Sequence, residues 1–162
     1  MTTNNLDFLI NVWSLLKERG INTWVFGGWA EEILKVASPR CHRDIDLLYP
    51  SSDFNLLDRV LAAYQDMDEI MEKRFSHKRA FVLDGVMVEV ILVERHSDGF
   101  ETSFFNGAAV YRWPDDIFDG RVELNGVCVD VSSPGAVIGY RNAYASIRQT
   151  IQAHANKLIE AS

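Results

Sequence analysis

The sequence lacks the features that mark a membrane, a secreted or a metal-thiolate protein. Its apolar runs stay well short of the roughly 20 residues that span a membrane as a helix. Residues 1–5 lack the basic and apolar regions of a signal peptide. The two cysteines, Cys41 and Cys128, are too far apart for a redox or zinc-binding pair, and no serine nucleophile elbow or Walker loop occurs. We therefore predict a cytoplasmic protein with free thiols and no membrane partner.

Positive charge is scarce as well. The chain has 16 lysines and arginines against 23 aspartates and glutamates, a net charge of −7, and its basic residues form no tract. Binding to nucleic acid relies on a basic surface, so we expect no nucleic-acid partner. The excess of negative charge would suit a cationic small-molecule substrate.

What is present is the composition of an ordinary globular protein. Hydrophobic residues make up 48% and charged residues 24% of the chain, which is typical of a folded domain. No repeat, linker or low-complexity segment interrupts the 162 residues. We predict a single domain over residues 1–162.

The hydrophobic pattern predicts a mixture of helices and strands. Helices are expected over residues 6–19, 29–36, from a cap at Ser51 or Ser52 to residue 64, and from a Ser133-Pro134 start over about 134–160. Strands are expected over residues 23–26, 43–49, 80–83, 86–93, 122–124 and 127–131. Asp84-Gly85 and Asn125-Gly126 are typical hairpin turns, whereas residues 98–119 are aromatic and irregular. This combination favours an α+β fold with a mixed sheet flanked by helices and a C-terminal helix.

Three carboxylates lie in segments that otherwise read as core strands. Asp44 and Asp46 are two residues apart in a strand, so their side chains point to the same side. Glu89 interrupts an apolar strand and, across a two-residue turn, would pair with Ala80, which leaves space above it. Oxygen ligands of this kind suit a hard divalent cation. The alternatives are a solvated strand edge for the aspartates and a structural ion pair of Glu89 with Arg79 or Arg43.

A glycine pair precedes the two aspartates. Gly27-Gly28 would permit the close backbone approach and free N–H groups that a phosphate needs, although a doubled glycine can also be a simple tight turn. Arg40, His42 and Arg43 form either a solvated basic patch or a set of phosphate contacts. Metal together with phosphate indicates metal-assisted phosphoryl transfer.

The aromatic segment is the candidate for contact with a second substrate. Aromatic side chains over residues 100–118, with Asp115 and Asp116, would suit a cationic molecule that carries rings. The alternative is that these aromatics belong to the hydrophobic core, which would remove half of that hypothesis.

The two motifs together resemble a known family. Residues 26–34 read Phe-Gly-Gly-Trp-Ala-Glu-Glu-Ile-Leu, and residues 40–46 read Arg-Cys-His-Arg-Asp-Ile-Asp. They are similar to the signature of the small antibiotic nucleotidyltransferases, above all the lincosamide nucleotidyltransferases and then the aminoglycoside 2''-adenylyltransferases. The likeness extends over most of residues 22–140 and implies the nucleotidyltransferase fold shared with DNA polymerase β.

The resemblance also implies roles for individual residues. Asp44 and Asp46 would hold Mg²⁺, and Glu89 would be the third carboxylate, a metal ligand or the general base for the acceptor hydroxyl. The triphosphate would be held by Gly27, Gly28 and either Arg40 or Arg43. Glu32 occupies a position where related chains often have an aspartate, and its role is less defined.

The expected function is therefore Mg²⁺-dependent transfer of a nucleoside monophosphate, AMP from ATP, to a hydroxyl of a small molecule. A lincosamide or aminoglycoside antibiotic is the acceptor class that the resemblance implies, which would make the protein a resistance enzyme. One alternative is transfer to a partner protein, as in toxin–antitoxin systems, but those chains usually have Gly-Ser in place of Gly-Gly-Trp. Another is a non-catalytic nucleotide-binding module, against which the three intact carboxylates argue. The sequence leaves open whether two subunits pair as a homodimer.

Overall fold

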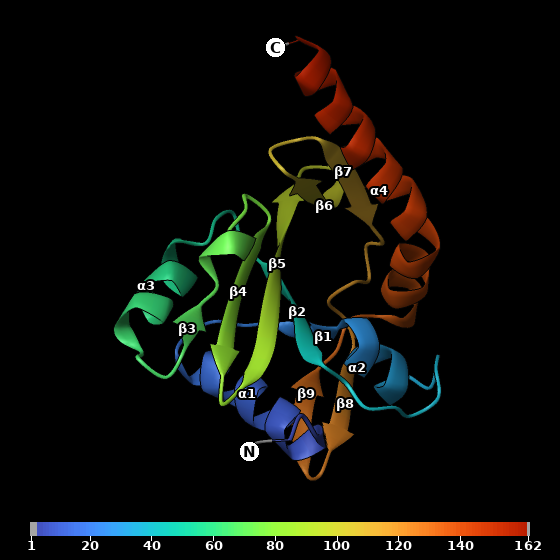
Figure 1. The fold of residues 1–162 in the computed structure, drawn as a ribbon. Coiled ribbons are helices and arrows are strands. Elements are labelled where there is room, and N and C mark those ends of the chain that lie inside the picture. Colours follow the sequence, from blue (N-terminus) through green and yellow to red (C-terminus); the bar gives the residue numbers. More distant parts are fainter. Residues whose placement is uncertain (1–2, 162) are drawn as a thin grey trace.

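The computed structural model describes residues 3–161 and has the predicted mixture of helices and strands (Figure 1). The helices are α1 (Leu6–Glu18), α2 (Gly27–Ile33), α3 (Asn55–Ala63), the short 3-10 helix η1 (Met71–Lys73) and α4 (Pro134–Ala161). The strands are β1 (Trp24–Phe26), β2 (Asp44–Pro50), β3 (Asp68–Glu69), β4 (Lys78–Leu83), β5 (Val86–His96), β6 (Gly99–Phe104), β7 (Ala109–Trp113), β8 (Arg121–Leu124) and β9 (Val127–Asp130).

The main sheet is mixed, as predicted, and β5 is its organising strand. The strand order is β1-β2-β5-β4-β3, in which β2 and β5 are parallel and the other neighbours are antiparallel. The last residues of β5, Glu94 to His96, pair instead with β6, which in turn pairs with β7. Strands β8 and β9 form a separate hairpin.

Both predicted hairpin turns are present. Asp84 and Gly85 have φ values of 49° and 82°, and Asn125 and Gly126 have φ values of 48° and 82°. These left-handed conformations are those of the tight turn that the Asp-Gly and Asn-Gly pairs favour. The first turn places Ala80 opposite Glu89, which confirms the predicted register.

The segment after β5 differs from its prediction. Residues 98–119 were expected to be irregular, but β6 and β7 form a hairpin within them. Its turn contains Phe105 and Asn106 at φ values of 49° and 56°. A phenylalanine in the left-handed region is uncommon, so this turn carries little local sequence signal.

The predicted starts of two helices differ from those in the structure. Helix α2 begins at Gly27, two residues earlier than predicted. Helix α3 is not capped by Ser51 or Ser52, because it begins after Phe54 and the carboxylate of Asp53 accepts a hydrogen bond from the backbone N–H of Asn55. The predicted start of α4 is confirmed, since the Ser133 hydroxyl accepts a hydrogen bond from the backbone N–H of Ala136 at 3.1 Å.

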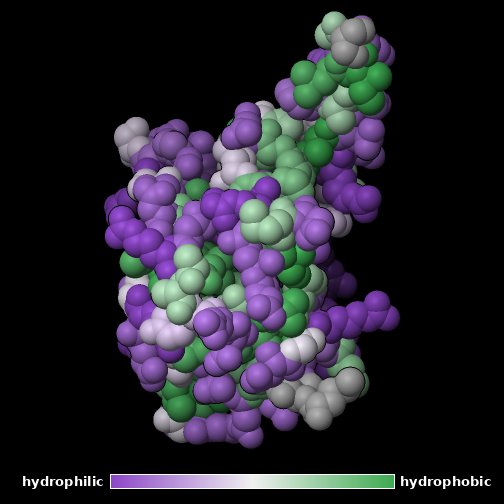
Figure 2. Space-filling view, turned by 60° about the vertical axis from the view of Figure 1, so that its left-hand side comes forward, coloured by the Kyte–Doolittle hydropathy of each residue, from purple (hydrophilic) through white to green (hydrophobic). Residues whose placement is uncertain are grey.

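The hydrophobic core leaves one face of the central strands available to polar groups. Ile45 and Leu47 of β2 are fully buried and pack with the apolar faces of α1 and α3. The alternate residues Asp44 and Asp46 lie half-buried on the opposite face. Helix α4 crosses that side of the molecule, packs on β7, and its C-terminal end stands clear of the body (Figures 1 and 2). Among residues 3–161, no helix is long and apolar enough to cross a membrane.

Candidate active site

The three predicted carboxylates lie together on the open face of the sheet. Asp46 of β2 and Glu89 of β5 are register partners on adjacent parallel strands, and Asp44 lies two residues before Asp46 on the same face. They line a cavity of about 400 Å³, here named the carboxylate pocket. Its lining residues are Phe26, Gly27, Gly28, Glu31, Asp44, Asp46, Lys78, Glu89, Ile91, Val137, Tyr140, Arg141 and Tyr144.

The glycine pair forms the rim of this pocket and lies against the aspartates. Gly27 has φ +62°, and a Cβ placed on it would collide with the carboxylate of Asp46 and lie 2.9 Å from its Cβ. A Cβ on Gly28 would lie 2.8 Å from the guanidinium of Arg40. The residue before the helix, Phe26, supplies no side-chain cap to the first turn of α2. Glycine is therefore required here to bring a backbone with uncapped N–H groups up to Asp46.

Two lysines hold Glu89, and the sequence analysis identified neither. The Lys73 ammonium donates to Oε1 of Glu89 at 2.8 Å, and the Lys78 ammonium donates to Oε2 at 3.2 Å. The expected partner Arg79 binds Asp58 instead, at 2.8 Å. Glu89 is thus ion-paired, but with different residues and on the open face of the sheet.

The electrostatic states of Asp46 and Glu89 differ although the two residues are neighbours. Burial, together with the negative charges of Asp44 and Glu89, raises the pKa of Asp46 to about 7. Burial also acts to raise the pKa of Glu89, but the hydrogen bond from Lys73 and the charge of Lys78 outweigh it and hold that pKa below its usual value. The two lysines are therefore ion-paired directly with Glu89, and at Asp46 their charges only partly offset burial and the neighbouring carboxylates.

This arrangement limits where a cation could bind. Within the part of the chain that the structure describes, no three His, Cys, Asp or Glu side chains are grouped as a metal site. At the carboxylate pocket, each oxygen of Glu89 accepts a hydrogen bond from a lysine. Asp44 and Asp46 remain as oxygen donors without a lysine partner, and the raised pKa of Asp46 reflects charge that a cation would neutralise.

The basic segment before β2 is organised by two glutamates of α2. The carboxylate of Glu32 accepts hydrogen bonds from the Arg40 backbone N–H at 3.0 Å and contacts the His42 ring nitrogen at 3.0 Å. The Arg40 side chain contacts Glu31 at 3.4 Å and lies beside Gly28. The His42 ring is buried and lies 4.1 Å from the Trp29 ring, centroid to centroid. The hypothesis of a solvated basic patch is therefore wrong for His42, and Glu32 organises this segment.

Arg40 or Arg43 was expected near the triphosphate. Both Arg40 and Arg43 are exposed and neither lines the carboxylate pocket, although the Arg40 guanidinium lies beside Gly28. An arginine that the sequence analysis did not identify, Arg141 of α4, does line this pocket and donates to Glu31 at 2.9 Å. Arg141 lies on α4, far along the chain from the glycine pair and the aspartates, so no local sequence pattern indicated it.

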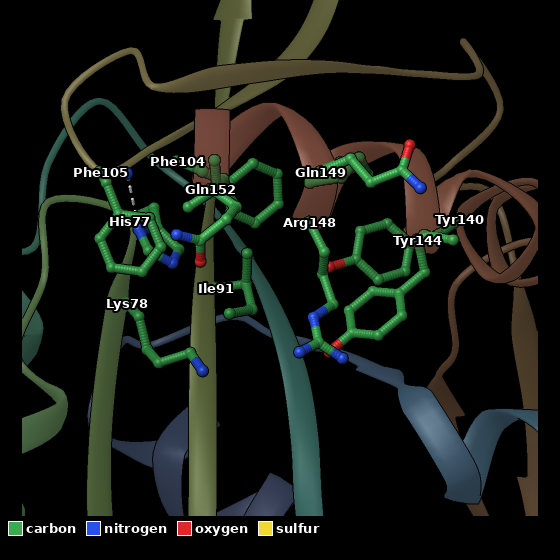
Figure 3. A pocket seen from close by; sticks show the side chains of 13 residues that line it. His77, Lys78, Ile91, Phe104, Phe105, Tyr140, Tyr144, Arg148, Gln149 and Gln152 are labelled. Carbon is green, nitrogen blue, oxygen red and sulfur yellow. Dashed lines mark hydrogen bonds between the residues drawn. The ribbon is translucent and has the colours of Figure 1, made fainter. Parts of the chain in front are cut away.

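A second cavity of about 620 Å³ continues from the first and is named here the aromatic pocket (Figure 3). It shares with the carboxylate pocket the residues Lys78, Ile91, Tyr140 and Tyr144. Its remaining lining residues are His77, Phe104, Phe105, Ala145, Ile147, Arg148, Gln149, Ile151 and Gln152. The β6–β7 turn and α4 thus close the space beyond Glu89.

The predicted aromatic contact segment reaches this pocket only in part. Phe104 and Phe105 line it, whereas Trp113 is buried in the core. Asp115 and Asp116 are exposed and line neither pocket, and Asp116 accepts a hydrogen bond from the Ser133 hydroxyl at 3.0 Å. The prediction that these two aspartates face a cationic substrate is not supported by their position.

Comparisons with known proteins identify the family and the fold of the chain. The family model for aminoglycoside-2''-adenylyltransferase matches residues 8–154. A comparison with curated protein sequences gave no match.

Solved structures with the same fold include two that were determined with an antibiotic or its adenylylated form. The lincosamide antibiotic adenylyltransferase LnuA, solved with lincomycin bound, has a TM-score of 0.70 and 14% identity over 95% of this chain and 98% of that chain. ANT(2'')-Ia in complex with adenylyl-2''-tobramycin has a TM-score of 0.59 and 15% identity over 94% and 88%. A putative nucleotidyltransferase from Thermotoga maritima has a TM-score of 0.58 and 20% identity over 97% and 93%. The nucleotidyltransferase fold predicted from the sequence is confirmed.

Proposed function

This chain belongs to the aminoglycoside-2''-adenylyltransferase family, and we propose that it transfers AMP from ATP to a hydroxyl of a small molecule with Mg²⁺ and release of pyrophosphate. The observation that carries the proposal is the meeting of Asp44, Asp46 and Glu89 in one pocket, against the Gly27-Gly28 turn. The acceptor classes that the family suggests are lincosamides and aminoglycosides, which would make the enzyme a determinant of antibiotic resistance that acts in the cytoplasm.

Asp44 and Asp46 would hold the metal. They are adjacent oxygen donors on one strand face, and the raised pKa of Asp46 reflects negative charge without a partner. This donor chemistry fits Mg²⁺, which takes one or two carboxylates together with phosphate oxygens. Bound there, Mg²⁺ would neutralise the charge that develops on the phosphate oxygens during transfer.

The glycine turn and nearby arginines would hold the triphosphate. Gly27 and Gly28 bring backbone N–H groups without a side-chain cap close to Asp46, so close that a Cβ on Gly27 would collide with its carboxylate. Such N–H groups bind phosphate oxygens without the obstruction of a Cβ. Arg40 beside Gly28 and Arg141 across the pocket would add positive charge, and Arg43 would contribute after a change of its side-chain position.

Glu89 would accept the proton of the acceptor hydroxyl. The two lysines keep it ionised, as a base must be before the reaction. Each of its oxygens accepts one lysine hydrogen bond and has a second lone pair, to which an acceptor hydroxyl could donate. The longer bond, 3.2 Å, belongs to Lys78, which also lines the aromatic pocket. An acceptor held in that pocket would therefore approach Glu89 beside Lys78.

Pyrophosphate release tests this proposal directly. We expect release that requires Mg²⁺, a nucleoside triphosphate and a hydroxylated acceptor, with ATP preferred, when each triphosphate is assayed against lincosamides, aminoglycosides and other hydroxylated compounds. Calorimetry should show binding of Mg²⁺–ATP before acceptor is added. An absence of nucleotide binding would overturn the proposal. If the nucleotide binds but no compound of the panel gives pyrophosphate release, the hypothesis of a small-molecule acceptor is overturned, and protein acceptors would be tested next.

A further inference from the structure

Tyr140 of α4 lies where the two pockets meet. It lines both the carboxylate pocket and the aromatic pocket, as do Lys78, Ile91 and Tyr144. Figure 3 shows the hydroxyl of Tyr140 on the cavity side of α4, directed away from the helix. No step of the proposed transfer uses this residue so far.

The ring of Tyr140 is held in place by other aromatic side chains. It stacks on Trp113, with ring centroids 5.3 Å and ring planes 14° apart, and it meets Phe26 edge-on at 5.3 Å between centroids. Tyr111 contacts it edge-on at 5.4 Å. Phe26 directly precedes the glycine pair, and Trp113 is buried in the core. The hydroxyl of Tyr140 therefore has a defined position relative to the glycine turn.

This hydroxyl has no hydrogen-bond partner among residues 3–161. It is not sealed in the core either, since in this part of the chain the buried side-chain nitrogen and oxygen atoms without a partner belong to Arg19 and Thr23. A tyrosine hydroxyl on a largely buried ring ordinarily has a partner. The partner of this hydroxyl must therefore come from the cavity, as solvent or as a bound ligand.

The hydroxyl of Tyr140 is a neutral O–H group that can donate a hydrogen bond. Burial is the main cause that raises the pKa of Tyr140 above its usual value, and the negative charges of Asp46 and Glu89 act in the same direction. An unperturbed tyrosine already keeps its proton at neutral pH. The charges of both carboxylates thus reach this hydroxyl, which keeps its proton beside them.

The phosphate that is transferred would lie at the same junction. In the proposed reaction, the triphosphate occupies the carboxylate pocket, and the acceptor in the aromatic pocket directs its hydroxyl from Glu89 onto the phosphorus, in line with the leaving group. The phosphorus under attack must therefore lie where the two pockets meet.

Tyr140 is the shared residue that is best placed to bind this phosphate. Of the other three, Ile91 is apolar, Lys78 donates to Glu89, and Tyr144 is 48% exposed. Tyr140 alone combines an enclosed ring with a free donor that faces the cavity.

We infer that Tyr140 is a catalytic residue whose hydroxyl donates a hydrogen bond to a nonbridging oxygen of the transferred α-phosphate. The inference rests on the proposed function and adds a residue to it. The hydrogen bond would stabilise negative charge on that oxygen while the bond from the acceptor oxygen to phosphorus forms and the bond from phosphorus to pyrophosphate breaks. Tyr140 keeps its proton throughout, because the proton of the acceptor hydroxyl goes to Glu89.

Tyr140→Phe tests the inference, because it removes the hydroxyl and keeps the ring. The matched control is Tyr111→Phe, which removes a hydroxyl from the same aromatic cluster at a residue that lines neither pocket. Both variants should keep the midpoint temperature of thermal unfolding of the wild type.

The first measurement is ³¹P NMR of α,β-methylene-ATP bound with Mg²⁺ to the full chain, which requires no acceptor. Tyr140→Phe should shift the α-phosphorus resonance of the bound analogue and leave the γ-phosphorus resonance in place. Tyr111→Phe should shift neither resonance.

The second measurement is the kinetics of pyrophosphate release from ATP with lincomycin and with tobramycin as acceptors. Tyr140→Phe should lower kcat by about ten- to hundredfold, as the loss of one hydrogen bond to a charged group does, while KM for ATP and for the acceptor stay nearly constant. Tyr111→Phe should keep the wild-type constants. If neither compound is an acceptor, the NMR measurement decides the inference by itself.

The inference alone is overturned if the analogue binds and Tyr140→Phe leaves its α-phosphorus resonance unchanged, if kcat stays at the wild-type value, or if Tyr111→Phe loses as much activity. A rise in KM for the acceptor at constant kcat would also overturn it, because the hydroxyl would then bind the acceptor and not the phosphate. If the wild type does not bind Mg²⁺ with the analogue, the proposed function is overturned, and the inference with it.

Discussion

The carboxylate pocket and the aromatic pocket are built from different kinds of structure. The first takes its charged groups from two adjacent central strands and a glycine turn, with positions fixed by register and by close backbone contact. The second is assembled from the β6–β7 turn, the start of β4, Ile91 of β5 and the face of α4 that is turned toward them. The proposed chemistry would therefore lie on the sheet, and the surface proposed to select the acceptor lies on elements that can vary without disturbing it.

The largest expected effect is loss of catalysis in the carboxylate pocket. Asp46→Asn should lower kcat for pyrophosphate release by at least about 10³-fold, since a neutral amide is a poor substitute for a metal-binding carboxylate worth several kcal/mol. Steady-state kinetics would measure this, with exposed Asp66→Asn as the matched control that keeps wild-type rates. An active Asp46→Asn enzyme would show that the chemistry is located elsewhere.

The same substitution should stabilise the metal-free protein. The pKa of Asp46 is raised from 3.8 to about 7 in the folded state. The proton on Asp46 therefore contributes its full stabilisation below pH 3.8, the pKa of the unfolded state. This stabilisation is lost as the pH rises through about 7, the pKa of the folded state. This loss amounts to at most about 4 kcal/mol, and Asn would not suffer it.

Urea unfolding in EDTA at a series of pH values would measure the difference. Asp46→Asn should be more stable than the wild type near pH 8, with a gap that closes toward pH 4. Parallel stability curves for the two proteins would contradict the assigned pKa. Addition of Mg²⁺ should stabilise the wild type and leave the variant unchanged.

A smaller effect is expected at the glycine turn. Gly27→Ala must place a Cβ against Asp46 at φ +62°, so it should destabilise the fold by about 1–3 kcal/mol and displace the carboxylate. Gly135→Ala in the first turn of α4 is the matched control, because nothing lies within 4 Å of its Cβ. The midpoint temperature of thermal unfolding and kcat should both fall for Gly27→Ala, and both should stay unchanged for Gly135→Ala. Equal behaviour of the two variants would mean that the turn is not constrained by Asp46.

The smallest effect is expected in the aromatic pocket. Phe105→Ala removes ring surface from a partly exposed wall, so KM for the acceptor should rise by roughly three- to tenfold while KM for ATP stays constant. Val110→Ala, exposed on the adjacent β7 and outside the pocket, should change neither constant. Bisubstrate kinetics would separate the two constants. A parallel rise in KM for ATP would show that the two pockets do not divide the substrates between them.

The sequence predicted the carboxylate pocket far better than the aromatic one, for physical reasons. The Asp84-Gly85 turn determines the register of its hairpin, so the pairing of Glu89 with Ala80 followed from local geometry. The parallel pairing that brings Asp46 beside Glu89 joins strands far apart in the chain, so no local pattern indicated it; the chemistry of the three carboxylates and the family resemblance suggested only that they converge. The roles of these residues stay predictions until they are tested by substitution.

The missed features depend on contacts that the sequence does not signal locally. The β6–β7 turn relies on a phenylalanine in the left-handed region, which no turn preference indicates. Lys78 could have been found, because it lies two residues before Ala80 on the same face as Glu89. Lys73 could not, since it reaches Glu89 from η1, outside the strand pattern.

Strand β5 has a consequence for regioselectivity. It carries Glu89, which lines the carboxylate pocket, and Ile91, which lines both pockets, on the same face of a single uninterrupted strand. Two residues of β-strand span about 6.5–7 Å, and this length cannot change without breaking the pairs on both sides. The strand would therefore fix the distance between the site that binds the acceptor ring and the carboxylate that accepts the hydroxyl proton. Of several hydroxyls on one acceptor, modification should fall on the one whose distance from the bound ring matches this spacing.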